Sequence, residues 1–237
     1  MRAFEEGTRS IGFRAFRDGL QSPDMECFSL DDPIPLGVSF FSRDTATVAR
    51  DLLGAILMSS AGGVVTGGRI VETEAYLGAD DPGSHAATRG VTRRNRVMYG
   101  PPGRAYVYFT YGNHHMLNIV TEPDGVAGAV LIRAIEPMVG EHAMAERRGR
   151  SMALTDGPGK VAQALGVDLS DNGTELGNGR LEVFAGPTSG LGVRCSGRIG
   201  LSSGHELPLR FYLEGNEHVS KARIGPRASK RRDTGGK

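Results

Sequence analysis

Three charged residues interrupt two otherwise apolar segments, and this arrangement limits the folds open to the chain. Glu72 and Glu74 lie in segment 70–76 (IVETEAY), and Arg133 lies inside segment 129–135 (AVLIRAI). Residues two positions apart in a β-strand share a face, so both glutamates would point to the same side of a sheet. Buried charge is costly unless it is paired. We therefore expect these segments to be neighbouring strands in which Arg133 meets the glutamates.

This pattern has two interpretations. Structural ion-pair networks resemble active sites in sequence, so a plain ion pair or a charge at the rim of the sheet would also explain Glu74 and Arg133. The alternative is a carboxylate kept for chemistry and held in place by the guanidinium. The distribution of aromatic and basic residues favours this second interpretation.

The composition favours short elements. The 237 residues include 35 glycines, which favour tight turns and short strands over long helices. Strand and helix patterns follow one another in mixed order, without regular βαβ alternation. We expect a single α+β domain, with a mixed or antiparallel β-sheet, flanking helices and a protruding β-hairpin. The expected strands are 55–58, 69–76, 106–111, 114–120, 129–135, 181–184, 192–199 and 209–213. The expected helices are 42–54 (capped by Ser42), 137–148 (opened by Pro137) and 158–166 (opened by Pro158).

Three regions are expected along the chain. Residues 1–36 mix charge, glycine and proline without periodicity, which predicts a disordered N-terminal extension. Residues 37–220 would form the folded domain, and the basic residues 221–237 a disordered tail. We expect no membrane span, because no run of about 18 apolar residues occurs. Cys27 and Cys195 lie far apart without ligand spacing, which suits a reducing cytoplasm.

Basic and aromatic residues are concentrated in one region. No Asp or Glu occurs between Pro82 and Thr121, and five of the six tyrosines lie between Tyr76 and Tyr111. Cations beside aromatic rings suit phosphate contacts and base stacking, so this region predicts a nucleic-acid partner. A solvated loop beside a strand with tyrosines on its core face is the simpler alternative, but it leaves the arginine excess unexplained. The arginines of the acid-free region are Arg89, Arg93, Arg94, Arg96 and Arg104.

Two further features suit a polyanion. Tyr111 precedes the Gly112-Asn113 turn, so its ring would lie at an exposed tip unless it wedges into a partner. Residues 156–160 (DGPGK) enter a helix N-terminus, where free N–H groups and Lys160 can hold a phosphate. An ordinary capped helix start explains the second feature equally well.

Several blocks of the sequence together carry a family resemblance. They are VETEAYLG at 71–78, RNR at 94–96, YVYFTYG at 106–112, Asn118, LIRAIEP at 131–137, GPGK at 157–160, RIG at 198–200 and PLRFY at 208–212. In this order and spacing the chain resembles the alkyladenine (3-methyladenine) DNA glycosylase family over residues 36–220. Several ordered blocks are far more specific than one short motif.

The resemblance implies a catalytic set. Glu74 would be the general base that deprotonates a water molecule. Arg133 would help to hold that water, together with the main-chain carbonyl of Ile199. No lysine lies between residues 71 and 78 to form a Schiff base, so we expect a monofunctional enzyme that leaves an abasic site uncut.

The resemblance also implies DNA-binding residues. Three rings would sandwich the everted base, namely Tyr76, His85 and Tyr108. Asn118 would clash with the 2-amino group of normal guanine, and Tyr111 would enter the minor groove and fill the vacated stack. The expected contacts to the DNA backbone are Arg94, Arg96, Arg148 and Lys160. At the hairpin tip Asn113 and His114 depart from the larger apolar or aromatic groups common in the family, which affects the strength of the wedge and the substrate range rather than the reaction.

The implied function is base-excision repair of DNA. The enzyme would flip alkylated or deaminated purines, such as 3-methyladenine or hypoxanthine, out of duplex DNA and hydrolyse the N-glycosidic bond. We expect no cofactor and no metal, double-stranded DNA with a damaged purine as partner, a monomer, and a cytoplasmic, nucleoid-associated location.

Two alternatives stay open at this point. A non-catalytic nucleic-acid-binding module would use the same sheet and arginines, but it would leave the Glu74–Arg133 pair without a task. A metal-dependent hydrolase lacks support, since no HExxH or HxH…D spacing occurs. Its candidate ligands would be Glu72, Glu74, Asp80, Asp81, His85, His114 and His115.

Overall fold

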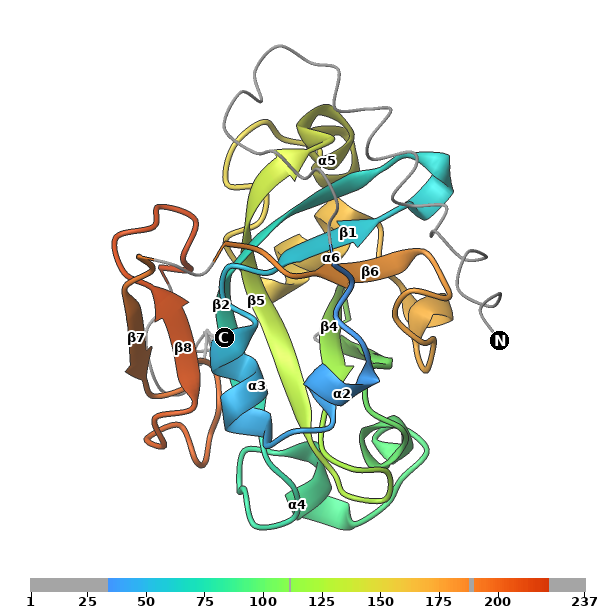
Figure 1. The fold of residues 1–237 in the computed structure, drawn as a ribbon, viewed down its shortest axis with the longest axis vertical. Helices are drawn as coiled ribbons and strands as arrows, with labels where there is room; N and C mark the ends of the chain where they lie inside the picture. Colours follow the sequence, from blue (N-terminus) through green and yellow to red (C-terminus); the bar gives the residue numbers. More distant parts are fainter. Residues whose placement is uncertain (1–33, 111, 188–189, 222–237) are drawn as a thin grey trace, which may run out of the picture.

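The computed structural model describes residues 34–110, 112–187 and 190–221 (Figure 1). Within these residues eight strands form one antiparallel sheet, which confirms the expected α+β class. The sheet order is β3-β4-β5-β2-β1-β6, with β8 paired to β2 and β7 paired to β8. The strands are β1 (Ile56–Ser59), β2 (Thr66–Tyr76), β3 (Ala105–Thr110), β4 (His114–Val120), β5 (Ala129–Val139), β6 (Leu181–Phe184), β7 (Val193–Ser196) and β8 (Arg210–Leu213).

The helices are short. The longest among the described residues, α5 and α6, have 8 residues each, and none of the described helices is long and apolar enough to cross a membrane. The α-helices are α2 (Val38–Phe41), α3 (Thr45–Asp51), α4 (His85–Arg89), α5 (Glu141–Arg148) and α6 (Pro158–Leu165). The 3₁₀ turns are η1 (Ala61–Gly63), η2 (Arg96–Tyr99) and η3 (Leu169–Asp171).

Strand β2 is the point at which the sheet divides. Along one edge it pairs with β5, and the two long strands run side by side through the centre of Figure 1. Along its other edge, residues 66–69 pair with β1 and residues 72–74 pair with β8. The β7–β8 hairpin therefore lies to one side of the molecule in Figure 1, away from β1 and β6. Glu72 and Glu74 consequently lie on a segment that is hydrogen-bonded along both edges.

The two faces of the sheet serve different purposes. One face packs against α3 and α6 in an apolar core, to which Val48, Val71, Ile132 and Val161 belong. Thr73 points to this side, because its hydroxyl donates to the main-chain carbonyl of α3 at Ala49 (2.7 Å). Strand alternation then places the neighbours of Thr73 on the opposite face, which carries the charged and aromatic side chains.

Two expected helix starts are wrong. Helix α3 is capped by Asp44, whose side chain accepts from the N–H of Thr47, whereas Ser42 ends the preceding helix α2. The 137–148 segment begins as strand, because β5 continues to Val139 and α5 starts only at Glu141. Pro137 fits there because it faces Gly68, where a Cβ would come within 2.1 Å of a main-chain oxygen of β5. The proline's fixed φ suits a strand as well as a helix start.

Three residues that were expected in the N-terminal extension belong to the folded domain. Residues 34–36, which the composition placed in the N-terminal extension, pair with β6. Pro35 bridges Phe184, and the N–H of Leu36 donates to the carbonyl of Val183 (2.8 Å). Residues 1–33 and 222–237 lie outside the described residues, so the expected disorder of both ends stays a prediction.

Candidate active site

The charged residues that interrupt the apolar strands form a buried cluster. Arg133 Nε donates to Glu72 Oε1 at 3.0 Å, and its Nη1 donates to Glu74 Oε2 at 3.2 Å. Both glutamates are fully buried, and 5 % of Arg133 is exposed. The expected pairing of the two strands through these charges is thereby confirmed. Because the carboxylates raise the pKa of the guanidinium, Arg133 stays charged despite its burial.

Glu74 is held by three different parts of the chain. Its Oε1 accepts from the backbone N–H of Ile199 (2.7 Å), and its Oε2 accepts from Arg133 and from the hydroxyl of Tyr76 (2.8 Å). Burial, and next the charge of Glu74, raise the pKa of Tyr76 well above its usual range, so the phenol keeps its proton. We expected the carbonyl of Ile199 to contribute to the site, and the observed bond is made by its N–H. The role of the carbonyl stays a prediction.

Glu72 anchors the cluster. It accepts from Arg133, from Arg210 Nε (2.6 Å), and from both the N–H (2.7 Å) and the hydroxyl (2.8 Å) of Ser220. Two carboxylates and two guanidiniums thus share one buried site, so their formal charges balance. With its lone pairs occupied in this way, Glu72 is suited to fix Arg133 in place, which leaves Glu74 as the carboxylate nearer to the cavity described next.

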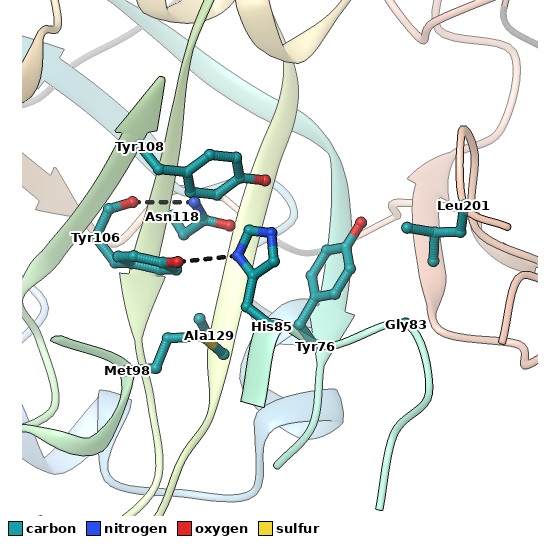
Figure 2. Close-up of a pocket in the computed structure, with 9 residues that line it drawn as sticks. All are labelled: Tyr76, Gly83, His85, Met98, Tyr106, Tyr108, Asn118, Ala129 and Leu201. Atoms are coloured by element: carbon teal, nitrogen blue, oxygen red, sulfur yellow. Dashed lines mark hydrogen bonds between the residues drawn. The ribbon is translucent and has the colours of Figure 1, made fainter. Parts of the chain in front are cut away.

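A cavity opens beside the cluster on the same face of the sheet (Figure 2). Its lining residues come from β2, β3, β4 and β5, from the segment around α4 and η2, and from the loop after β7. They are Tyr76, Gly83, His85, Met98, Tyr106, Tyr108, Asn118, Ala129 and Leu201. All four residues expected to surround a base therefore lie together here, namely the rings of Tyr76, His85 and Tyr108 and the amide of Asn118. Figure 2 shows the ring of Tyr76 between His85 and the pair Gly83 and Leu201.

The rings of the cavity pack against one another, and two of them are hydrogen-bonded. The rings of His85 and Tyr108 meet edge to face, with centroids 4.8 Å apart, and Tyr106 packs against Tyr108 at 5.4 Å. The hydroxyl of Tyr106 and Nδ1 of His85 are hydrogen-bonded at 2.9 Å. Burial and then the nearby charge of Arg94 lower the pKa of His85, so the ring is neutral at neutral pH. Burial raises the pKa of Tyr106, so its phenol also stays neutral.

Glu74 lies behind the wall of the cavity. The residues that line the cavity do not include Glu74 itself, but they include its hydrogen-bond partner Tyr76. Asn118 is buried and its amide nitrogen donates to the carbonyl of Tyr106 (2.9 Å), which fixes the side chain at the cavity wall. The site thus combines an oriented carboxylate with a cavity of neutral aromatic rings.

The basic residues expected to meet DNA lie in two places. Arg94 and Arg96 are exposed near the cavity, and the guanidinium of Arg94 lies 4.8 Å from the centroid of the Tyr108 ring. Lys160 and Arg148 lie on α6 and α5, away from the cavity lining, where Lys160 pairs with Asp156 at 2.7 Å.

The hairpin and α6 lie close together. A Cβ at Gly159 would meet the ring of His114 at about 3 Å, which places the start of α6 against the start of β4. The hairpin β3–β4 itself was expected and is confirmed. Tyr111, expected to wedge into DNA, lies outside the described residues, so its role stays a prediction.

Sequence reasoning missed several residues of the site. Arg198 and Asp81 form a fully buried ion pair beside Tyr76, and Leu201 and Tyr106 line the cavity. Arg198 lies in the RIG block, where the only available signal was its position next to Ile199. Asp81 is the last acidic residue before the acid-free region, and its isolation from later acids gave no hint of a partner so far along the chain.

The metal-dependent alternative requires a cluster of ligating side chains. Within the described ranges, no three His, Cys, Asp or Glu side chains lie close enough together to hold a metal ion. That alternative is tested directly by activity in the presence of EDTA.

Comparison with known proteins shows the family. The sequence model of the methylpurine-DNA glycosylases matches residues 39–217. A protein of Methanoculleus marisnigri is 48% identical over 192 residues, covering 78% of this chain and 98% of its own. One of Chlorobium luteolum is 49% identical over 192 residues, covering 79% and 97%. One of Koribacter versatilis is 44% identical over 202 residues, covering 82% and 97%. All three carry the provisional name 3-methyladenine DNA glycosylase.

The match places the chain in the class of DNA-repair glycosylases, as the resemblance implied. The chain belongs to the methylpurine-DNA glycosylase family. DNA is therefore its substrate, and the cluster and cavity described above lie within the matched residues.

Proposed function

We propose that this protein is a monofunctional purine-DNA glycosylase that flips alkylated or deaminated purines out of duplex DNA and hydrolyses their bond to the sugar. The observation that carries this proposal is the position of Glu74. Its carboxylate is buried and held by Arg133, Tyr76 and Ile199 directly behind an aromatic cavity. A carboxylate oriented this firmly beside a base-stacking surface suits attack on a sugar by water.

The cavity would receive the everted base. Taking a base out of the duplex costs a few kcal/mol, and less when the base is damaged or mispaired. Stacking on aromatic rings contributes about 1–3 kcal/mol per base, and Tyr76, His85 and Tyr108 provide such rings. Tyr111, which lies between β3 and β4 in the sequence, would offset more of the cost by occupying the vacated stack. Neutral, electron-rich rings attract a cationic alkylated purine in particular.

Hydrolysis would proceed through an oxocarbenium-like sugar. The bond between C1′ and the purine nitrogen breaks, and its electron pair leaves with the base. The water oxygen then bonds to C1′ while Glu74 takes the proton of the water. The negative charge of Glu74 also stabilises the positive charge that develops on the sugar. A purine alkylated at N3 or N7 already carries positive charge and becomes neutral on leaving, so it needs no acid. Neutral hypoxanthine leaves with the electron pair as an anion and takes its proton from solvent.

The supporting residues would orient this chemistry and limit its substrates. Arg133 and the N–H of Ile199 hold the carboxylate in one orientation, and the Ile199 carbonyl is proposed to bind the water. Asn118, fixed at the cavity wall by its bond to Tyr106, would clash with the 2-amino group of normal guanine. The product would be an uncut abasic site, because segment 71–78 holds no lysine for strand cleavage.

Contacts to the DNA backbone would come from both groups of basic residues. Arg94 and Arg96 are exposed, and Arg94 lies against the cavity residue Tyr108. Lys160 lies in the first turn of α6, next to Gly159, which faces His114 of the hairpin, and Arg148 at the end of α5 donates to Gln163 of α6. Such contacts add affinity without reading sequence.

The Glu74→Gln variant tests the proposal. We expect it to bind methylated duplex DNA as the wild type does, while base release falls by about 100-fold to 10,000-fold, the usual contribution of a general base. Glu136→Gln, on the neighbouring strand β5, is the matched control and should keep full activity. Alkali treatment of the DNA, which cleaves abasic sites, measures the release. Full activity of Glu74→Gln would overturn the assignment, and a wild type that binds damaged DNA without base release would indicate a binding module.

A further inference from the structure

An ion pair lies buried immediately behind one wall of the cavity. Arg198 and Asp81 are 0 % and 2 % exposed, and the guanidinium donates to both carboxylate oxygens, with one contact of 2.6 Å. Removing two charges from water is expensive, and a well-packed apolar pair is often as stable. A pair at this position therefore calls for an explanation other than stability.

Arg198 connects the segments that form the cavity. Its Nη1 donates to the carbonyl of Ala75 in β2 (2.9 Å), and its Nη2 donates to that of Gly204 (2.9 Å). Asp81 in turn accepts from the N–H groups of Leu77 (3.0 Å) and Gly83 (2.9 Å), on the segment that leads to His85. The pair thus ties the end of β2 to the segment before α4 and to the loop that carries Ile199 and Leu201.

The guanidinium also lies over a ring of the cavity. Arg198 Cζ is 4.8 Å from the centroid of the Tyr76 ring, in cation–π contact. Figure 2 shows the Tyr76 ring between His85 and Gly83, and Arg198 adjoins Gly83, where a Cβ would lie 2.6 Å from its Nη2. A base stacked between Tyr76 and His85 would therefore have Arg198 beyond the Tyr76 ring. Removal of the arginine would therefore disturb both the position and the electrostatics of Tyr76.

The charge of Arg198 matters because the proposed substrates include cationic purines. A base in van der Waals contact with the ring, about 3.5 Å away, would lie about 8 Å from the guanidinium. At an effective dielectric constant of about 20, two unit charges about 8 Å apart repel enough to change an equilibrium roughly 30-fold. Asp81 supplies the opposite charge at hydrogen-bond distance and offsets most of this repulsion.

We propose that Arg198 positions Tyr76 and the two adjoining loops, and that Asp81 neutralises Arg198 so that the ring can accept a cationic purine. The inference rests on the proposed function and adds a determinant of substrate charge to it. Asp81 and Arg198 are positioning residues, since they act on the base through Tyr76.

The test compares cationic and neutral bases. Single-turnover release of 7-methylguanine from methylated duplex DNA is measured beside release of hypoxanthine from inosine-containing duplex, and their ratio is the readout. Asp81→Asn leaves the cation without its counter-charge, so we expect the ratio to fall by about 10-fold to 30-fold. The double variant Arg198→Gln with Asp81→Asn removes both charges. We expect its ratio of 7-methylguanine release to hypoxanthine release to return to within about threefold of the wild-type ratio. Thermal melting verifies that each variant is folded.

The outcomes separate the two proposals. Equal losses on both bases in Asp81→Asn, with an unchanged ratio, would overturn the charge assignment and leave a purely structural pair. If Asp81→Asn does not fold, Arg198→Gln carries the test, because it leaves an anion behind Tyr76 and should raise the ratio. An unchanged ratio there would equally overturn the inference. A wild type that releases neither base would refute the proposed function instead.

Discussion

The backbone N–H of Ile199 donates to Glu74 across 125 positions of sequence, with a nitrogen–oxygen distance of 2.7 Å. The bond joins a loop to the central strand of the sheet, and it occupies the carboxylate oxygen that Arg133 and Tyr76 leave open. Glu74 therefore has a fixed orientation before any DNA is bound. Such preorganisation is what a carboxylate needs to stabilise charge that develops only in the transition state.

Replacement of Arg133 should lower the stability of the protein. Arg133→Met leaves two buried carboxylates without one of their partners, and we expect the free energy of unfolding to fall by about 3–5 kcal/mol. Urea denaturation followed by circular dichroism measures the change. Exposed Arg93→Met is the control and should have little effect. A loss in Arg133→Met no larger than that of the control would contradict a buried, mutually dependent cluster.

The stability should depend on pH through His85. Its pKa is lowered by burial and by Arg94, so the unfolded chain takes up this proton at a higher pH than the folded chain. Between the unfolded value of about 6.5 and the lower folded value, the unfolded state binds more protons, and stability falls as the pH drops. His85→Gln should reduce the loss of stability between about pH 7 and about pH 5. Urea denaturation across this range checks it, with exposed His142→Gln as a control that should keep the wild-type slope.

The ion pair of Lys160 should compete with DNA. Lys160 donates to Asp156 at 2.7 Å, so a phosphate must displace this carboxylate or share the ammonium with it. Asp156→Asn should tighten DNA binding, whereas Lys160→Met should weaken it and reduce the slope of log affinity against log salt by about 1. Fluorescence anisotropy at several salt concentrations, on damaged and undamaged duplexes alike, measures both effects. An unchanged slope in Lys160→Met would show that the lysine meets no phosphate.

A methyl group at Gly83 should distort the cavity. A Cβ there would lie 2.6 Å from Arg198 Nη2 and 2.7 Å from Leu201 Cδ1, too close for either group. Gly83→Ala should therefore lower the free energy of unfolding by about 1–3 kcal/mol and slow base release. Gly37→Ala is the control, because a Cβ at Gly37 meets no atom within 4 Å. Normal stability together with normal base release in Gly83→Ala would show that Arg198 and Leu201 can move to make room for the methyl group without cost to stability or activity.

The pairing of Glu74 with Arg133 could be predicted because it depends on local sequence patterns. Glu74 and Arg133 stand out within strands whose alternation fixes their face, and opposite charges in two apolar strands invite pairing. The Arg198–Asp81 pair could not be predicted in this way. Its residues come from irregular segments 117 positions apart, where no periodicity says which side chains point inward. The start of α5 was misjudged because Pro137 suits both a strand and a helix N-terminus, and the close approach of Gly68 that favours the strand is a tertiary contact.

The pairing of β2 along both edges indicates which parts of the site can vary among relatives and which cannot. Residues 72–74 are bonded to β5 on one side and β8 on the other, so the carboxylate of Glu74, which we propose as the general base, has little freedom to shift. Accommodation of lesions that differ in size and shape must then come from the irregular segments around Gly83 and Leu201. A change in the range of damaged bases among relatives is accordingly expected to follow substitutions in those segments, while the central strand stays as it is.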